Sequence, residues 1–299
     1  MDEINFTVII PHKNLPYLLQ RCIDSIPRRD DIEIIIVDDN SDPDKVDFEN
    51  FPGKDRPEVK IFFDKSNKGA GAARNIGIRN ACGKWLLFAD CDDTYTSGLN
   101  DFLNEFKDST SDIVYFKCNI QSTCTPRRVV PYMNIYIDNY IRTNKRLNDI
   151  KFGAWEPWNK LIKRSVVVDN CIEFDEISSS NDKMFSLYLG CYVKDVSVVD
   201  RVLYNYILRQ GSIIHSGKRR FINSFETTIR QNELYHKIRY DRKQSILLLL
   251  LRNLDCVNYN ILQKFWRYIL DNQANPFEGF ISSILFYFKY HVLHAHKKI

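Results

Sequence analysis

Short apolar runs alternate with stretches of helical spacing over the first part of the chain. Residues 6–10 are apolar and β-branched and stop at Pro11, which predicts a buried strand. Apolar residues recur at helical spacing over 15–26, and Pro27 ends that segment. By the same reasoning a helix is predicted over 70–81, and further strands are predicted at 32–37, 59–63, 85–89 and 113–116.

Strands that alternate with helices predict an α/β fold, with a mostly parallel sheet flanked by helices. Ligands of such sheets bind outside the carboxyl ends of the strands. Two of the predicted strands end in clusters of aspartates, one beginning at Asp38 and the other at Asp90. This coincidence predicts a binding site at that edge of the sheet.

The pattern changes after residue 200, where the chain becomes helical, basic and aromatic. Helices are predicted over 221–240, 245–254, 261–270 and 277–295, with a domain boundary near 215. From Arg201 onward the chain holds 16 Lys and Arg against 6 Asp and Glu, whereas the first 200 residues hold 26 against 32. We therefore expect a domain over 1–215 and a basic helical extension over 216–299 that meet different partners.

Composition narrows the class of protein further. The chain is 44% apolar and 27% charged, which is typical of a folded globular protein. None of the eight cysteines forms a C-x-x-C pair, which argues against a zinc or redox site. The N-terminus lacks the pattern of a signal peptide, and no apolar run reaches the ~18 residues of a membrane span. These features favour a cytoplasmic location with free thiols.

The cluster Asp90-Cys91-Asp92-Asp93 directly follows a predicted strand. Carboxylates this close repel one another unless a cation or hydrogen-bond donors compensate. Mg²⁺ or Mn²⁺ would suit the site, because these ions take oxygen ligands and keep places for phosphate oxygens. The alternative is an acidic turn that caps the next helix.

The other two polar segments are equally open to two interpretations. Asp39 either accepts a hydrogen bond from a base or belongs to an ordinary turn. Residues 68–75 read Lys-Gly-Ala-Gly-Ala-Ala-Arg-Asn, so that Arg74 either approaches a phosphate or belongs to a small-residue helix packed on the sheet. The glycine pattern is incomplete and lacks a ribose-binding acid, which argues against a nicotinamide oxidoreductase.

Together these segments resemble glycosyltransferase family 2, whose members have the GT-A fold. The order and spacing of the matching motifs hold over roughly residues 4–105. They are Val8-Ile-Ile-Pro11 with Asn14, Glu33-Ile-Ile-Ile-Val-Asp-Asp39-Asn-Ser41, Asn67-Lys-Gly69, Ala73-Arg-Asn-Ile-Gly77 and Gly83-Lys-Trp-Leu-Leu-Phe-Ala-Asp-Cys-Asp-Asp93. A second block, Trp158-Asn-Lys-Leu-Ile-Lys-Arg164 and Asn181-Asp182-Lys-Met-Phe185, resembles the acceptor-side half of the family.

The resemblance implies a nucleotide-sugar half over 1–110 and an acceptor half over 111–215. The nucleotide side would comprise Pro11, Asn14 and Asp39 at the nucleoside, Arg74 near the nucleotide, Asp90 at the ribose, and Asp92 on a Mn²⁺ or Mg²⁺ ion that bridges the diphosphate. On the acceptor side, Asp182 matches the general base of the family.

Two departures from the family pattern affect these roles. Lys13 stands where the family has an aromatic residue, so its aliphatic stem is expected to cover the base instead. Asn181 replaces the glutamate of a Glu-Asp pair, which removes a like charge and is expected to leave the pKa of Asp182 lower.

The implied function is that of an inverting glycosyltransferase, which moves a sugar from a nucleotide diphosphate-sugar, by family habit a UDP-sugar, to a carbohydrate or lipid-linked acceptor. Cell-surface polysaccharide or glycolipid synthesis is the expected setting. The alternative is a catalytically degenerate protein of the same fold that binds a membrane surface or a nucleotide.

The end of the chain suggests a membrane surface rather than nucleic acid as a partner. Residues 277–299 combine large aromatic and aliphatic side chains with a basic end, as in helices that lie on an anionic leaflet. We thus expect a peripheral location on the inner face of the cell membrane. The alternative is a helix that folds back onto the catalytic domain.

Overall fold

The computed structural model describes residues 3–122, 131–209 and 218–288. The chain divides into two compact units, Met1–Gln210 and Gly211–Ile299. Each unit has its own hydrophobic core, so each is described separately.

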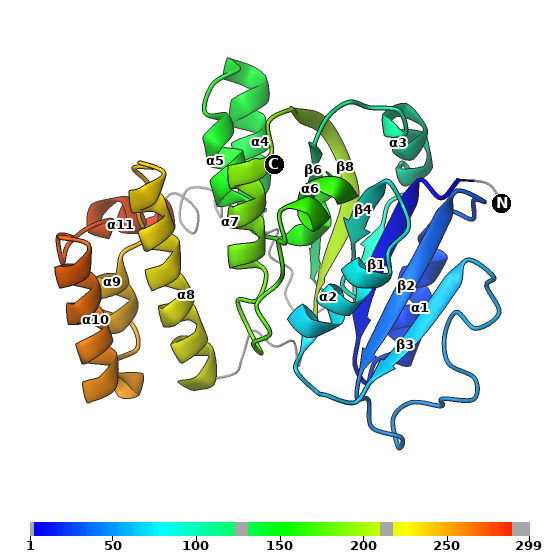
Figure 1. Ribbon diagram of the computed structural model, residues 1–299, viewed down its shortest axis with the longest axis horizontal. Helices are drawn as coiled ribbons and strands as arrows, with labels where there is room; N and C mark the ends of the chain where they lie inside the picture. The colour runs from blue at the N-terminus through cyan, green and yellow to red at the C-terminus, as the bar shows by residue number, and fades with distance from the viewer. Residues whose placement is uncertain (1–2, 123–130, 210–217, 289–299) are drawn as a thin grey trace. The chain divides into compact units, whose positions relative to one another are not determined.

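Within its described residues, the first unit is built on one eight-stranded sheet in the order β3-β2-β1-β4-β7-β6-β8-β5 (Figure 1). The strands are β1 (Phe6–His12), β2 (Ile32–Asp39), β3 (Val59–Asp64), β4 (Trp85–Phe88), β5 (Thr94–Tyr95), β6 (Ile113–Ser122), β7 (Lys160–Lys163) and β8 (Val196–Leu208). Strands β3, β2, β1 and β4 are parallel, as are β6 and β8, whereas β7 and β5 run antiparallel to their neighbours. The predicted α/β fold with a mostly parallel sheet is confirmed.

Helices flank this sheet (Figure 1). They are α1 (Pro16–Asp24), α2 (Ala70–Asn80), α3 (Leu99–Phe106), α4 (Tyr132–Thr143), α5 (Leu147–Gly153), α6 (Arg164–Asp169) and α7 (Lys183–Tyr192), with a short 3-10 turn η1 (Pro157–Asn159). Helix α2 packs on β1 and β2. A Cβ at Gly77 would lie 2.4 Å from Cγ2 of Ile9, so the small residues of α2 permit this close approach.

Strand β1 continues through Pro11 to His12, two residues past its predicted end. Ile9 and Pro11 point their backbone groups to the same side of the strand, towards β4. Pairing between β1 and β4 ends at Ile9, so the missing N–H of Pro11 costs no ladder hydrogen bond. Proline is therefore compatible with the end of a central strand here.

The second unit is helical, with α8 (Lys218–Lys237), α9 (Ile246–Leu251), the 3-10 turn η3 (Leu254–Cys256), α10 (Tyr259–Asp271) and α11 (Phe280–Phe288). Its core includes Phe221, Phe225, Leu250, Ile261 and Phe265. The last helix begins at Phe280 rather than 277, and residues 289–299 of the predicted membrane-binding segment lie outside the described range. Among the described helices, none is both long and apolar enough to cross a membrane.

Candidate active site

The carboxyl ends of β1, β2 and β4 bring both aspartate clusters to one edge of the sheet. At this edge His12 pairs in register with Asp38. Nδ1 of His12 lies 2.7 Å from Oδ2 of Asp38, and Nε2 accepts the backbone N–H of Leu15 at 3.0 Å. These two contacts require a histidine protonated on Nδ1.

Asp38 is held as a carboxylate by this histidine and by Ser41. Ser41 donates its backbone N–H at 2.9 Å and its hydroxyl at 2.6 Å to the two oxygens. Burial raises the pKa of Asp38, but the hydrogen bonds from His12 and Ser41 outweigh burial and leave that pKa lowered. Asp38 therefore anchors the loop after β2 and leaves Asp39 as the carboxylate available to a ligand.

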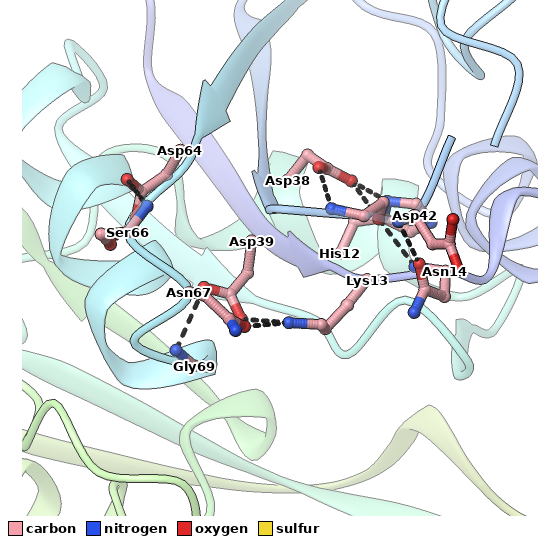
Figure 2. Close-up of polar contacts among 11 residues, drawn as sticks. His12, Lys13, Asn14, Asp38, Asp39, Asp42, Asp64, Ser66, Asn67 and Gly69 are labelled. Atoms are coloured by element: carbon pink, nitrogen blue, oxygen red, sulfur yellow. Dashed lines mark hydrogen bonds and ion pairs between the residues drawn. The ribbon is translucent and has the colours of Figure 1, made fainter. Parts of the chain in front are cut away.

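Asp39 lies between Lys13 and Gly69 (Figure 2). Nζ of Lys13 lies 3.3 Å from Oδ2 of Asp39, and the backbone N–H of Gly69 donates to Oδ1 at 3.1 Å. Gly69 has a φ of +92°, where side chains are strained, so glycine is required to aim this N–H. Lys13 also donates to Asn67, so its ammonium joins Asp39 and Asn67. A hydrogen-bond donor and an acceptor therefore stand side by side here, in addition to the apolar stem expected from the sequence.

Asn14 ties the ends of β1 and β2 together (Figure 2). Its φ of +58° lies in the left-handed region that asparagine tolerates. Its Oδ1 accepts the backbone N–H of Asp42 at 2.7 Å, and its own N–H donates to Ser41 at 2.8 Å. Asn14 is thus part of the backbone framework beside Asp39, and Pro11 precedes it on β1, in register with Val37.

Arg74, on α2, contacts residues that lie far apart in the sequence of the first unit. Its Nη2 donates to Oδ1 of Asp90 and its Nη1 donates to Oδ1 of Asn181 at 3.0 Å. The guanidinium also lies over the ring of Phe174, 5.3 Å from its centroid. Because Asn181 supplies a neutral oxygen, it binds Arg74 without adding a negative charge to the site.

The carboxylates after β4 have different partners. Asp92 pairs with Nε of Arg209 at 2.7 Å. Asp93 is fully buried and accepts the hydroxyl of Tyr204 at 2.8 Å and a backbone N–H of β8 at 2.7 Å. Burial raises the pKa of Asp93 well above its usual range, and the charges of Asp90 and Asp92 raise it further. Asp93 thus fixes β8 to the loop, whereas Asp90 and Asp92 stay partly exposed and pair with Arg74 and Arg209.

The surroundings of Asp92 are compatible with a divalent cation that a ligand would share. Within the described part of the chain, no group of three His, Cys, Asp or Glu side chains could hold a metal ion. Burial raises the pKa of Asp92 and the charge of Asp90 adds to it, a repulsion that a cation would offset. Mg²⁺ and Mn²⁺ accept one or two carboxylates together with phosphate oxygens and water. A single partly exposed carboxylate therefore suffices, provided that Arg209 gives up its place.

Asp182 immediately precedes α7, and its carbonyl accepts the backbone N–H of Ser186 at 3.0 Å. Burial raises the pKa of its carboxyl, the positive charges of Arg74 and Lys160 lower it, and the charge of Asp90 raises it. The net shift of the pKa of Asp182 is upward from its ordinary value. The expected effect of Asn181 concerns the comparison with a glutamate at that position, and it stays a prediction.

Four side chains of this region were not found from the sequence: Arg209, Tyr132, Glu156 and Lys160. Glu156 lies just before the motif that begins at Trp158. Trp158 itself is buried and stacks on Tyr204, with ring centroids 4.7 Å apart. No local signal reveals that Lys160 is fully buried or that the pKa of Glu156 is raised, because both depend on distant strands and helices.

The sequence is similar to those of known glycosyltransferases. Residues 7–169 match the profile of the family described as glycosyl transferase family 2. The putative glycosyltransferase EpsH of Bacillus subtilis is 25% identical over 273 residues, which cover 86% of this chain and 77% of that protein. The poly(ribitol-phosphate) beta-glucosyltransferase of Bacillus spizizenii is 29% identical over 215 residues, which cover 69% of this chain and 33% of that protein.

Among solved structures, S. aureus TarS 1–349 in complex with UDP-GlcNAc aligns with a TM-score of 0.60 at 21% identity. The alignment covers 89% of this chain and 73% of that one. At this identity the likeness supports the GT-A fold alone.

Proposed function

The chain belongs to glycosyl transferase family 2 and is a glycosyltransferase, and from this premise we propose that it moves a sugar from a nucleotide diphosphate-sugar to an acceptor hydroxyl with inversion. The observation that carries the proposal is the pair of hydrogen bonds made by Arg74, to Asp90 on one side and to Asn181 on the other. Because Asn181 adjoins Asp182, this arginine links a nucleotide side and an acceptor side.

On the nucleotide side, the edge of the parallel strands would bind the nucleoside diphosphate. Asp39 and Lys13 offer an acceptor and a donor to the edge of a base, with Pro11 and Asn14 beside them. Asp90 would accept a ribose hydroxyl, and Arg74 would supply positive charge near the diphosphate. These roles divide the unit into a nucleotide-sugar half over 1–110 and an acceptor half over 111–215.

A Mn²⁺ or Mg²⁺ ion would be held by Asp92, with Asp90 next to it. When bound, such an ion neutralises negative charge on the diphosphate. Arg209 is the counter-charge of Asp92 in this structure. Once released from Asp92, its guanidinium could bind a phosphate oxygen directly.

On the acceptor side, Asp182 would act as the general base. Its carboxylate takes the proton of the acceptor hydroxyl while that oxygen bonds to the anomeric carbon. The bond from this carbon to the diphosphate oxygen breaks, and its electron pair departs with the diphosphate. Attack from the opposite face inverts the configuration. The raised pKa makes Asp182 a stronger base than an exposed aspartate.

The relatives suggest a donor and a setting. The solved complexes of TarS contain UDP-GlcNAc and UDP, which supports a UDP-sugar donor. The Bacillus spizizenii relative is named as acting on poly(ribitol-phosphate), which supports a carbohydrate or lipid-linked acceptor and a role in cell-surface polysaccharide or glycolipid synthesis. This chain spans only a third of that relative, so the assignment to a setting is a proposal.

The second unit would hold the enzyme on an anionic membrane surface through residues 277–299, at the inner face of the cell membrane. In the described part of this segment Phe277, Ile281 and Leu285 are four residues apart and 64%, 73% and 62% exposed. Ile281 and Leu285 lie one turn apart on α11, and Phe277 lies in the turn before that helix. Exposed apolar side chains of this kind, within a unit rich in Lys and Arg, suit the surface of an anionic bilayer.

A thermal-shift panel tests the proposal. UDP, GDP, ADP and CDP are compared with and without Mn²⁺, and at least one should stabilise the chain. A catalytically degenerate protein of this fold would bind a nucleotide yet release none from a nucleotide-sugar when an acceptor is present. No stabilisation by any of the four would refute the nucleotide site.

A further inference from the structure

The two arginines beside the acidic loop after β4 are held in different ways. Within the described residues, the guanidinium of Arg74 has three contacts, which are made with Asp90, Asn181 and the ring of Phe174. The side chain of Arg209 makes one hydrogen bond within those residues, from Nε to Oδ2 of Asp92 at 2.7 Å. Arg74 is therefore a fixed part of the fold, whereas Arg209 is a partner that Asp92 can exchange.

The backbone on both sides of the Arg209–Asp92 ion pair is anchored. The N–H of Ile207, two residues before Arg209, donates to Oδ1 of Asp93 at 2.7 Å. Nη2 of Arg21 donates to the backbone carbonyl of Asp92 at 2.6 Å. Arg209 can therefore leave the carboxylate of Asp92 by a change of side-chain rotamer, without movement of β8 or of the loop.

A divalent cation and Arg209 would compete for the carboxylate of Asp92. The guanidinium already occupies Oδ2, and a Mn²⁺ or Mg²⁺ ion on the same carboxylate would lie close to its positive charge. The side chains of Arg209 and Asp92 are only 27% and 22% exposed, so dissolved salt screens this repulsion little. The ion pair therefore lowers the affinity of Asp92 for a cation for as long as it persists.

We propose that Arg209 is a positioning residue that makes the metal affinity of the site depend on the nucleotide, because it holds Asp92 until a phosphate offers it another partner. The inference rests on the proposed nucleotide and metal sites and concerns how their occupation is linked. A nucleotide diphosphate favours the released arginine through its phosphate oxygens, and a cation binds once Asp92 is released. Each ligand thus removes a cost that the other would otherwise meet, so the two bind with positive coupling.

The first test measures the binding of Mn²⁺ by electron paramagnetic resonance, which reports the free ion and needs no assay of transfer. Without nucleotide, Arg209→Gln should bind Mn²⁺ roughly 3–10-fold more tightly than the wild type, because a largely desolvated charged hydrogen bond no longer has to be broken. Addition of saturating UDP should raise the Mn²⁺ affinity of the wild type by a larger factor than that of Arg209→Gln. Equal affinities of the two proteins without nucleotide would overturn the proposal.

Arg201→Gln is the matched control for the loss of one positive charge. Arg201 lies on β8, is exposed and pairs with Glu105 at 2.6 Å rather than with the acidic loop. Its substitution should leave the Mn²⁺ affinity at the wild-type value. A gain in Arg201→Gln equal to that in Arg209→Gln would mean that net charge sets the affinity, and the proposed role of the contact with Asp92 would fall.

The second test observes Arg209 in the wild type by NMR. Its Nε–H signal is the one that is missing from Arg209→Gln, or from Arg209→Lys if the first variant does not fold. Mg²⁺ and UDP together should shift this signal, and EDTA with removal of UDP should restore it. A signal that stays in place while the ion binds would refute the exchange.

The two tests separate failure of this inference from failure of the proposed metal site. If the wild type binds no Mn²⁺ either with or without UDP, the metal role of Asp92 fails together with the inference. If Mn²⁺ binds and Arg209→Gln leaves its affinity unchanged, the inference alone fails and the proposed metal site stands.

Discussion

Asp182→Asn is the substitution on which the proposed chemistry depends most directly. Asparagine has the size of aspartate and can occupy the position before a helix, but it cannot take a proton from a hydroxyl at neutral pH. The side chain of Asp182 makes no capping hydrogen bond to α7, so none is lost. The exchange therefore removes the proposed base with little change in shape.

The expected loss of transfer activity in Asp182→Asn is that of a missing general base. General base catalysis contributes about 10²–10⁴-fold, which corresponds to roughly 2.7–5.4 kcal/mol of activation free energy at 1.36 kcal/mol per factor of ten. Stability should not fall, because burial already opposes the charge that the substitution removes. Nucleotide affinity should also change little, since Arg74 keeps its bonds to Asp90 and Asn181.

Release of the nucleotide diphosphate from a nucleotide-sugar is measured in the presence of acceptor, alongside the dissociation constant of the nucleotide. Asp101→Asn is a matched control, because Asp101 is an exposed aspartate in the first turn of α3. It shares the favourable position near a helix N-terminus without lying near the site. Turnover of Asp182→Asn near that of the control, with the correct acceptor, would show that another group takes the proton.

Three further predictions test the remaining roles. UDP should raise the unfolding temperature more with Mn²⁺ than without it, and Asp92→Ala should abolish the increment; the same shift with and without metal in both proteins would count against a metal at Asp92. Asp39→Ala should weaken nucleotide binding by about 1–3 kcal/mol in calorimetric titration, because a charged hydrogen-bond partner is lost, and an unchanged Kd would remove Asp39 from the site. The full chain should sediment with anionic liposomes and be released by high salt, whereas a variant with Phe277, Ile281 and Leu285 changed to serine should stay in the supernatant; co-sedimentation of that variant would contradict the proposal.

Substitution is preferred to truncation in the last experiment because of contacts made by Glu278. Its Oε2 lies 3.1 Å from Nε2 of His236 and accepts the hydroxyl of Tyr268 at 3.0 Å. A chain that ends before Glu278 would lose these bonds and could unfold for that reason alone. The three exposed apolar side chains can be changed without touching them.

Local pattern was enough to predict the parallel half of the sheet. The strands β1, β2 and β4 are buried over their full lengths, so their sequences are mostly apolar runs. Turn residues and segments of helical spacing separate these runs in the sequence. Two aspartate clusters at the ends of such strands must come to one edge, because parallel neighbours share a direction. Asp39, Asp90 and Asp92 could therefore be selected from the sequence.

The partners of those aspartates were decided only by the tertiary structure. Arg209 is 117 residues from Asp92, and Asn181 is 107 residues from Arg74. No sequence spacing predicts contacts between residues this far apart. Which of them meet depends on where β7 and β8 lie in the sheet. Asp93 is an aspartate like Asp90 and Asp92, and the sequence does not distinguish the three. Asp93 has a structural role because Tyr204 and the backbone of β8 donate hydrogen bonds to its carboxyl.

The same reasoning applies to the acceptor side. The sequence, through its resemblance to the family, selected Asp182 and predicted the effect of its neighbour Asn181, but it gave no sign of the upward shift of the pKa of Asp182. Desolvation depends on how many atoms from other elements surround a carboxyl, and that quantity exists only in the folded chain. Glu156, Lys160 and Tyr132 come from three separate segments that the fold brings together, so their shared electrostatics could not be read from any one of them.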